Sequence, residues 1–169
     1  MLKLYLDTSV ILKRCITEPG TETTDIIFDK AETGELAITF SLWNIGEALG
    51  VLDEKRRKGW LKEKEFKQTL NLFADELIKL MRLKTLEIIP VQTPILTSTW
   101  NLLMNYHIYE ADALQITTCG YNNNDALLTS DEKLAQTSRK AGLKTIHIPK
   151  DEQELKTLIQ QSRKQNQRK

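Results

Sequence analysis

The stretch that decides the fold is Lys3–Leu12, with the sequence KLYLDTSVIL. It begins with a short apolar run, and Asp7 follows directly, before the hydroxyl residues Thr8 and Ser9. An apolar strand that ends in a carboxylate and small hydroxyl residues is typical of an α/β sheet, where ligands gather at the carboxyl ends of the strands. We therefore expect Asp7 to lie at such an end, near the middle of the fold.

The whole chain has the composition of one soluble globular domain. It has 169 residues, of which 40% are hydrophobic and 28% charged, with a formal net charge of +1. This balance excludes a protein whose whole surface is a polycation, although a local basic patch remains compatible with it. Two cysteines far apart favour reduced thiols, and two histidines are too few for a His-based zinc site. Without a leader or a membrane-length apolar run, we expect a cytoplasmic protein that does not contact membranes.

Strand and helix signals alternate along the chain, which predicts α/β architecture with a parallel sheet. The chain divides into one domain over residues 1–149 and a C-terminal helix with a basic tail over 150–169. We expect this tail to fray; its cations are Arg163, Lys164, Arg168 and Lys169. The expected strands are 4–6, 36–40, 86–91, 126–129 and 144–148, and the expected helices are 9–16, 21–31, 42–58, 61–83, 94–106, 109–120, 131–141 and 151–161.

Four acids occupy positions that suggest joint chemistry. Asp7 and Asp131 follow strands, whereas Glu47 and Asp112 lie in helices among apolar neighbours. Taken singly, a strand-end acid is equally well a helix cap, and a helical acid is more often the rim of a buried stripe. In a sheet of order 3-2-1-4-5, however, the first and fourth strands flank the crevice where ligands bind. Carboxylates gathered there repel one another, and a hard divalent cation, Mg²⁺ or Mn²⁺, is the natural neutraliser.

These four segments together resemble the PIN domain, and most closely the single-domain, VapC-like toxin ribonucleases. The resemblance rests on LYLDTSVIL, NIGEALGVL, YEADALQITTC and LLTSDEKL, and it covers the chain from Met1 to about Pro149. It implies a single α/β domain with a five-stranded parallel sheet flanked by helices. It also implies that Asp7, Glu47, Asp112 and Asp131 are the catalytic, metal-binding acids.

The resemblance further implies hydrolysis of RNA phosphodiester bonds with Mg²⁺ or Mn²⁺, by an endoribonuclease that leaves a 5′-phosphate and a 3′-hydroxyl. Asp7 would be the central ligand, Asp112 and Asp131 its partners, and Glu47 a ligand directly or through water. Supporting roles would fall to hydroxyl residues and one further acid, namely Thr8, Ser9, Ser130 and, as an outer candidate, Glu110. A homodimer and a small antitoxin protein of a type II toxin–antitoxin pair are the implied partners.

Contacts to RNA outside the acidic centre need positive charge, and the basic run Lys55, Arg56, Arg57 and Lys58 is a candidate. An equally good interpretation is a solvated helix end whose cations complement the helix dipole. Trp43, Trp60 and Trp100 could stack on bases, although core or interface packing is the more common role. The apolar stripe of the helix over 61–83 serves core packing by default, or else a protein interface.

Three rival functions remain to be weighed. A haloacid-dehalogenase-type phosphatase needs an acid two residues after the strand-end Asp, and Ser9 stands at that position. The complete set of acids argues against a PIN-fold RNA-binding or scaffolding module without turnover. A structure-specific DNA nuclease is disfavoured because the chain has no large insertions.

Overall fold

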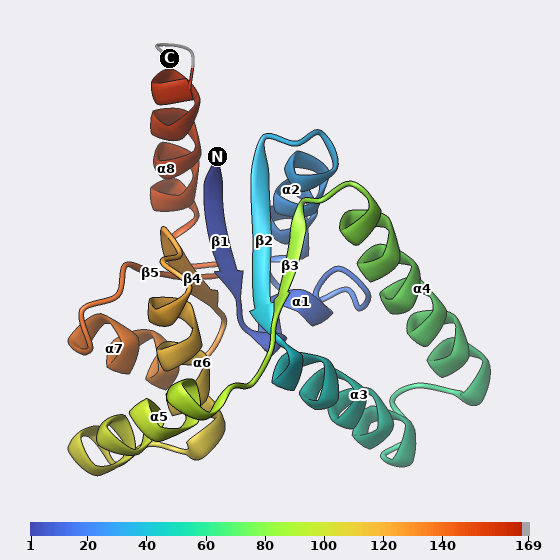
Figure 1. Ribbon diagram of the computed structural model, residues 1–169. Helices are drawn as coiled ribbons and strands as arrows, with labels where there is room; N and C mark the ends of the chain where they lie inside the picture. Colours follow the sequence, from blue (N-terminus) through green and yellow to red (C-terminus); the bar gives the residue numbers. More distant parts are fainter. Residues whose placement is uncertain (167–169) are drawn as a thin grey trace.

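The computed structural model describes residues 1–166, and these form five strands and eight helices (Figure 1). The strands are β1 (Leu2–Leu6), β2 (Leu36–Ser41), β3 (Leu86–Ile89), β4 (Ala126–Thr129) and β5 (Thr145–His147). The helices are α1 (Thr8–Leu12), α2 (Thr21–Glu32), α3 (Leu42–Arg57), α4 (Glu63–Arg82), α5 (Thr93–Tyr106), α6 (Glu110–Tyr121), α7 (Glu132–Lys140) and α8 (Glu152–Asn166).

The strands pair in parallel in the order β3-β2-β1-β4-β5, which confirms the predicted sheet. β1 is central, and its Leu4, Tyr5 and Leu6 are fully buried. A parallel sheet is covered on both faces by helices, so its strands are continuous apolar runs, as LKLYL is. Figure 1 shows the carboxyl ends of β1 and β2 meeting near the start of α3, and this is the edge at which Asp7 lies.

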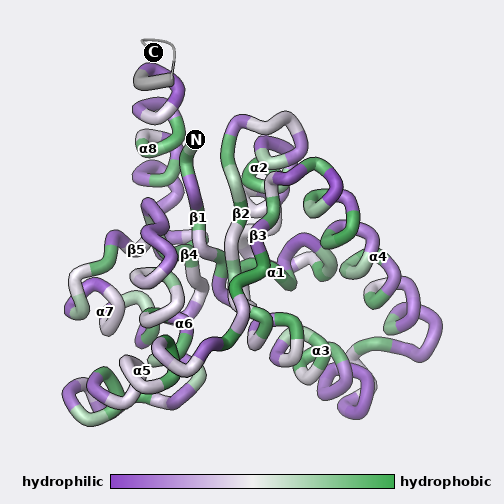
Figure 2. The backbone as a smooth tube through the Cα atoms, in the orientation of Figure 1, coloured by the Kyte–Doolittle hydropathy of each residue, from purple (hydrophilic) through white to green (hydrophobic). Residues whose placement is uncertain are grey.

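The helices complete the core around this sheet. Figure 1 shows α5, α6 and α7 grouped together on one side and α4 on the other, while the start of α3 lies close enough to α6 for Asn44 to donate a hydrogen bond to Gln115. Phe73 and Leu80 of α4 are buried, while Phe66, Leu70 and Leu77 are partly buried against the same core. The apolar stripe of this helix therefore packs in the core, which was the first of its two interpretations. Figure 2 shows that the end of α3 and the start of α4 are hydrophilic by contrast.

Two helix ends differ from the sequence prediction by more than two residues. The first helix ends at Leu12 instead of residue 16. The last helix runs to Asn166 instead of residue 161, because Leu155 and Ile159 are buried in the core and Arg163 pairs with Glu35. Of the predicted basic tail, Arg168 and Lys169 lie outside the described residues.

Three exposed aromatic side chains overturn one expectation. Trp43, Trp60 and Trp100 are 46%, 68% and 61% exposed, so core packing is wrong for all three. Trp43 and Trp100 lie on the outer faces of α3 and α5, and Trp60 lies in the turn between α3 and α4. Both Cys15 and Cys119 are free thiols, as predicted. Within the described part of the chain, no helix has the length and hydropathy needed to cross a membrane.

Candidate active site

Asp7 lies at the end of β1 and is only 5% exposed. Its Oδ2 accepts a hydrogen bond from the Ser9 hydroxyl at 2.5 Å, from the Thr129 hydroxyl at 2.8 Å and from the Ser9 backbone N–H at 3.4 Å. Asp7 is also the N-cap of α1, so the two interpretations of this position are compatible. The hydrogen bonds converge on one oxygen and fix the direction of the carboxylate, while its Oδ1 accepts no hydrogen bond from the described residues.

Asp131 follows the neighbouring strand β4 and caps α7. Its Oδ1 accepts hydrogen bonds from the backbone N–H groups of Lys133 and Leu134 at 2.7 and 3.0 Å. The Asp131 N–H donates to the hydroxyl of Thr129, the same hydroxyl that donates to Asp7. Thr129 therefore couples the ends of β1 and β4, and with them the two strand-end acids.

The predicted supporting hydroxyls divide into those that contact the acids and one that does not. Ser9 donates to Asp7 and accepts from the backbone N–H of Ser130 at 2.9 Å. Thr8 donates to Glu47 at 2.8 Å. The Ser130 hydroxyl is buried without a hydrogen-bond partner among the described residues, so Ser130 contributes through its backbone.

Glu47 lies in the second turn of α3 and is half-buried. Its Oε2 accepts the hydrogen bond from Thr8 and a longer one, 3.4 Å, from the side-chain amide of Gln115. Burial raises the pKa of Glu47, the hydrogen bond from Thr8 opposes this rise, and the negative charge of Asp7 adds to it. Glu47 is therefore oriented from α1 and α6 as well as by its own helix.

A buried amide network supports Glu47, and sequence reasoning missed it. Asn44 is fully buried, and its amide donates to Thr8 at 2.9 Å and to Gln115 at 3.0 Å. Its carbonyl oxygen accepts from the Tyr5 hydroxyl at 2.9 Å. Burial raises the pKa of Tyr5 far above its usual range, so the phenol remains a neutral donor. A signal was present, because Asn44 precedes Glu47 by three residues and Gln115 follows Asp112 by three, which places each pair on one helix face.

Asp112 lies in the first turn of α6, and its pKa depends on the other acids of the cluster. Its pKa rises from 3.8 to about 6, first because of burial and then because of the negative charges of Asp131, Asp7 and Glu47. All four acids line one cavity of about 490 Å³. The structure thus brings together four acids that are distant in sequence, as the sheet order predicted. Glu110, the outer candidate, is exposed and does not line this cavity.

The donors suit a hard cation, but their present orientation does not yet enclose one. Among residues 1–166, no group of three or more His, Cys, Asp or Glu side chains lies close enough together to hold one metal ion. Asp7, Glu47 and Asp131 each direct one oxygen to hydrogen-bond donors of the protein. Carboxylate oxygens are nevertheless the ligands that Mg²⁺ and Mn²⁺ prefer. The pKa of Asp112 is raised mainly by burial and further by the three neighbouring negative charges, which a cation would offset.

Comparison with known proteins identifies the fold. The family model of the PIN domain matches residues 4–140, which is most of the chain. This chain belongs to the PIN-domain family. A search of curated proteins found no match.

Several solved structures superpose on this PIN domain along most of its length. The protein PAE2754 of Pyrobaculum aerophilum is 13% identical, with 95% of this chain and 89% of that chain covered at a TM-score of 0.64. VapBC2 of Rickettsia felis, bound to a DNA fragment from its promoter, is 16% identical. The match covers 86% of this chain and 98% of that chain, with a TM-score of 0.61. VapC20 of Mycobacterium tuberculosis, described as a toxin that cleaves the sarcin–ricin loop, is 12% identical. The match covers 83% of this chain and 95% of that chain, with a TM-score of 0.58. At these identities the likeness shows a shared fold.

The basic run at the end of α3 is paired with acids of the PIN domain itself. Lys55 contacts Glu18 at 2.8 Å, and Lys58 contacts Glu54 at 2.6 Å. Arg56 and Arg57 both pair with Asp53, at 2.7 and 2.9 Å. These contacts favour the interpretation of a solvated helix end. Lys55 differs from the others, because it lines the acidic cavity together with Glu18 and Glu54.

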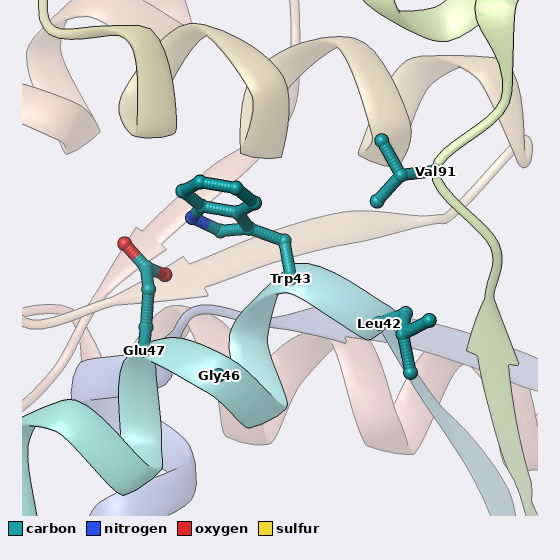
Figure 3. Close-up of a pocket in the computed structure, with 5 residues that line it drawn as sticks. All are labelled: Leu42, Trp43, Gly46, Glu47 and Val91. Atoms are coloured by element: carbon teal, nitrogen blue, oxygen red, sulfur yellow. The ribbon is translucent and has the colours of Figure 1, made fainter.

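A second cavity of about 470 Å³ adjoins the acids of the PIN domain. It is lined by Leu42, Trp43, Gly46 and Glu47 of α3, and by Val91, which follows β3 (Figure 3). Glu47 lines both cavities. In Figure 3 the Trp43 indole lies between Glu47 and Val91, with its ring nitrogen on the side of the Glu47 carboxylate. Trp43 also lowers the pKa of Glu47, against the larger effect of burial.

Proposed function

We propose that this PIN domain is a metal-dependent endoribonuclease that hydrolyses RNA phosphodiester bonds, and that it is the toxin of a type II toxin–antitoxin pair. The observation that supports this most is the convergence of Asp7, Glu47, Asp112 and Asp131 on one cavity, with the pKa of Asp112 raised by burial and, in addition, by the charges of the other three acids. Four carboxylates repel an RNA phosphate unless a cation neutralises them.

In this proposal, Asp7, Glu47, Asp112 and Asp131 bind Mg²⁺ or Mn²⁺, with Asp7 as the central ligand. When bound there, Mg²⁺ or Mn²⁺ would supply a water of lowered pKa and charge stabilisation for the leaving oxygen. Asp7 and Asp131 are already anchored through one oxygen each, so the other oxygen is available as a ligand. Asp112 would lose its proton on binding the ion, and cleavage would leave a 5′-phosphate and a 3′-hydroxyl.

The hydrogen bonds around the acids would keep them in position during the reaction. The hydroxyls of Ser9 and Thr129 hold Asp7, and the amide network around Asn44 holds Thr8 and Gln115 against Glu47. Outer partners of this kind typically contribute about 10–100-fold to metal affinity or activity.

The proposed partners follow from the family. A small antitoxin protein would cover the acidic cavity, and a second copy of the chain would form a homodimer. The likeness to VapBC2 of Rickettsia felis, which is seen on promoter DNA, supports a toxin–antitoxin context. Light scattering of the purified protein measures the oligomeric state, and the neighbouring gene tests whether an antitoxin is encoded.

The decisive experiment incubates the purified protein with cellular RNA, with Mn²⁺, with Mg²⁺ and with a chelator, and maps the cut ends. Asp7→Asn should lower the cleavage rate by about 100-fold or more, because it removes a direct ligand, while circular dichroism stays unchanged. Cleavage by the Asp7→Asn protein at the wild-type rate, or cleavage that persists in chelator, contradicts the proposal. Preference for flap DNA over RNA would indicate the DNA-nuclease alternative.

A further inference from the structure

The lining of the second cavity suits the base of a nucleotide and not its phosphate. Its lining is Leu42, Trp43, Gly46, Val91 and, at one side, Glu47. None of these residues is a cation, so the cavity offers nothing to hold a phosphate, and Glu47 repels one. The apolar wall and the indole suit a flat, uncharged ring. A volume of about 470 Å³ is within the range of small-ligand sites.

Trp43 is placed as a stacking platform. Its side chain is 46% exposed, although it lies at the start of a helix whose Asn44 and Ala48 are fully buried. In Figure 3 the indole nitrogen lies on the side of the Glu47 carboxylate, so the ring turns an edge, and not its face, toward the neighbouring acid. A ring oriented through its edge keeps its face available to a ligand.

The position relative to the acids points to a substrate group. Trp43 and Glu47 are four residues apart on α3, so their side chains are neighbours about 5–6 Å apart at Cβ. Because Glu47 lines both cavities, a phosphodiester at the acids has its adjoining nucleoside within reach of Trp43. We propose that this cavity binds one unstacked base of single-stranded RNA, stacked on Trp43 beside the scissile phosphate. This inference rests on the proposed function and adds a base-binding subsite to it.

Gly46 provides a test that does not depend on removing a side chain. A Cβ built at Gly46 meets nothing within 4 Å, and the residue has ordinary helical geometry. Leucine has a higher helix propensity than glycine, so Gly46→Leu should fold while its side chain fills the cavity. Trp43→Ala removes the platform and Trp43→Phe keeps an aromatic face. Trp100→Ala is the matched control, because Trp100 is exposed on α5 and lines neither cavity.

The experiment measures binding and cleavage separately. Binding of a labelled single-stranded RNA oligonucleotide is followed by fluorescence anisotropy in the full-length Asp7→Asn protein, in which cutting is strongly slowed. KM is measured in the wild-type background. A set of oligonucleotides carries one abasic nucleotide at successive positions. Because base stacking on an aromatic side chain typically contributes a factor of about ten or more, Trp43→Ala and Gly46→Leu should each raise Kd and KM about tenfold. Trp43→Phe should have a smaller effect, and Trp100→Ala none.

The abasic series decides whether the base itself is what Trp43 binds. Abasic substitution at one position next to the cut should weaken binding to the protein with Trp43 and have no further effect on Trp43→Ala. The proposal is overturned if the loss of affinity from the abasic substitution and the loss from Trp43→Ala add independently, or if no abasic position weakens binding. It is also overturned if the variants release a protein partner while binding RNA normally. Metal-dependent cleavage by the wild type alongside such a result leaves the proposed function intact. The opposite result is position-specific binding of RNA without any cleavage. It would support the base-binding subsite and contradict the proposed nuclease activity.

Discussion

Replacing Asp112 by asparagine should stabilise the metal-free protein at neutral pH and have no such effect in acid. In the folded protein the pKa of Asp112 is about 6 instead of 3.8, because the carboxylate is half-buried beside three other acids. The folded state therefore binds the Asp112 proton more tightly than the unfolded state does. The wild type loses this contribution to its stability as pH rises from about 3.8 to about 6, and above that range it carries the full penalty of the charged form.

The magnitude follows from the size of the shift. A shift of this size corresponds to about 3 kcal/mol at about 1.4 kcal/mol per pKa unit. Because Asp112 is partly exposed to solvent, screening reduces this to about 1–2 kcal/mol. Asp112 also lies in the first turn of α6, where loss of negative charge costs about 0.3–1 kcal/mol through the helix dipole. The net gain for Asp112→Asn should be about 1 kcal/mol, or about 2–4 °C in Tm for a chain of this size.

Urea unfolding in the presence of a chelator, at several pH values between 4 and 8, measures this difference. Glu110→Gln is the matched control, because Glu110 lies in the same first turn but is exposed and outside the acidic cavity. It should lose stability by about 0.3–1 kcal/mol through the dipole alone. The reasoning is refuted if Asp112→Asn destabilises the protein at pH 8 as Glu110→Gln does, or if its effect does not change with pH. Saturating Mg²⁺ should reverse the order, since the wild type then gains binding energy.

Three further predictions concern the surroundings of the acids. Asn44→Leu should lower the free energy of unfolding by about 2–4 kcal/mol in urea, because it leaves several buried polar groups without partners; a change below the error of the fit would show that the network contributes little. Thr129→Val should lower RNA cleavage about 10–100-fold with unchanged circular dichroism, because the hydroxyl that orients Asp7 is lost, and Thr129→Ser should restore it. Lys55→Ala should reduce the slope of log Kd for RNA against log salt by about one, whereas Arg57→Ala, which does not line the cavity, should leave it unchanged. Equal slopes for the two variants would remove Lys55 from the phosphate contacts.

Local patterns in the chain were sufficient for the architecture and for the acids. The apolar run before Asp7 and the one before Asp131 define two strands, and parallel strands place their carboxyl ends at one edge of a sheet. Once the order 3-2-1-4-5 is adopted, these two acids must be neighbours. The two helical acids were recognisable because each interrupts apolar surroundings, and the structure places both at the same cavity. The order of elements and most of their ends were predictable for the same reason, since periodicity and capping are local.

The contacts that give each acid its environment depend on residues far apart in the chain, and only the tertiary structure decided them. Asn44 bonds to Gln115 across 71 positions, and Thr129 bonds to Asp7 across 122. Sequence spacing cannot state which donors meet across such separations, because the answer depends on how β1, α3 and α6 pack. The same reason explains the indole of Trp43, which is exposed beside Glu47 and not packed in the core. Hydrophobicity places a residue on a helix, but the packing of that helix decides whether the residue faces the core or a cavity.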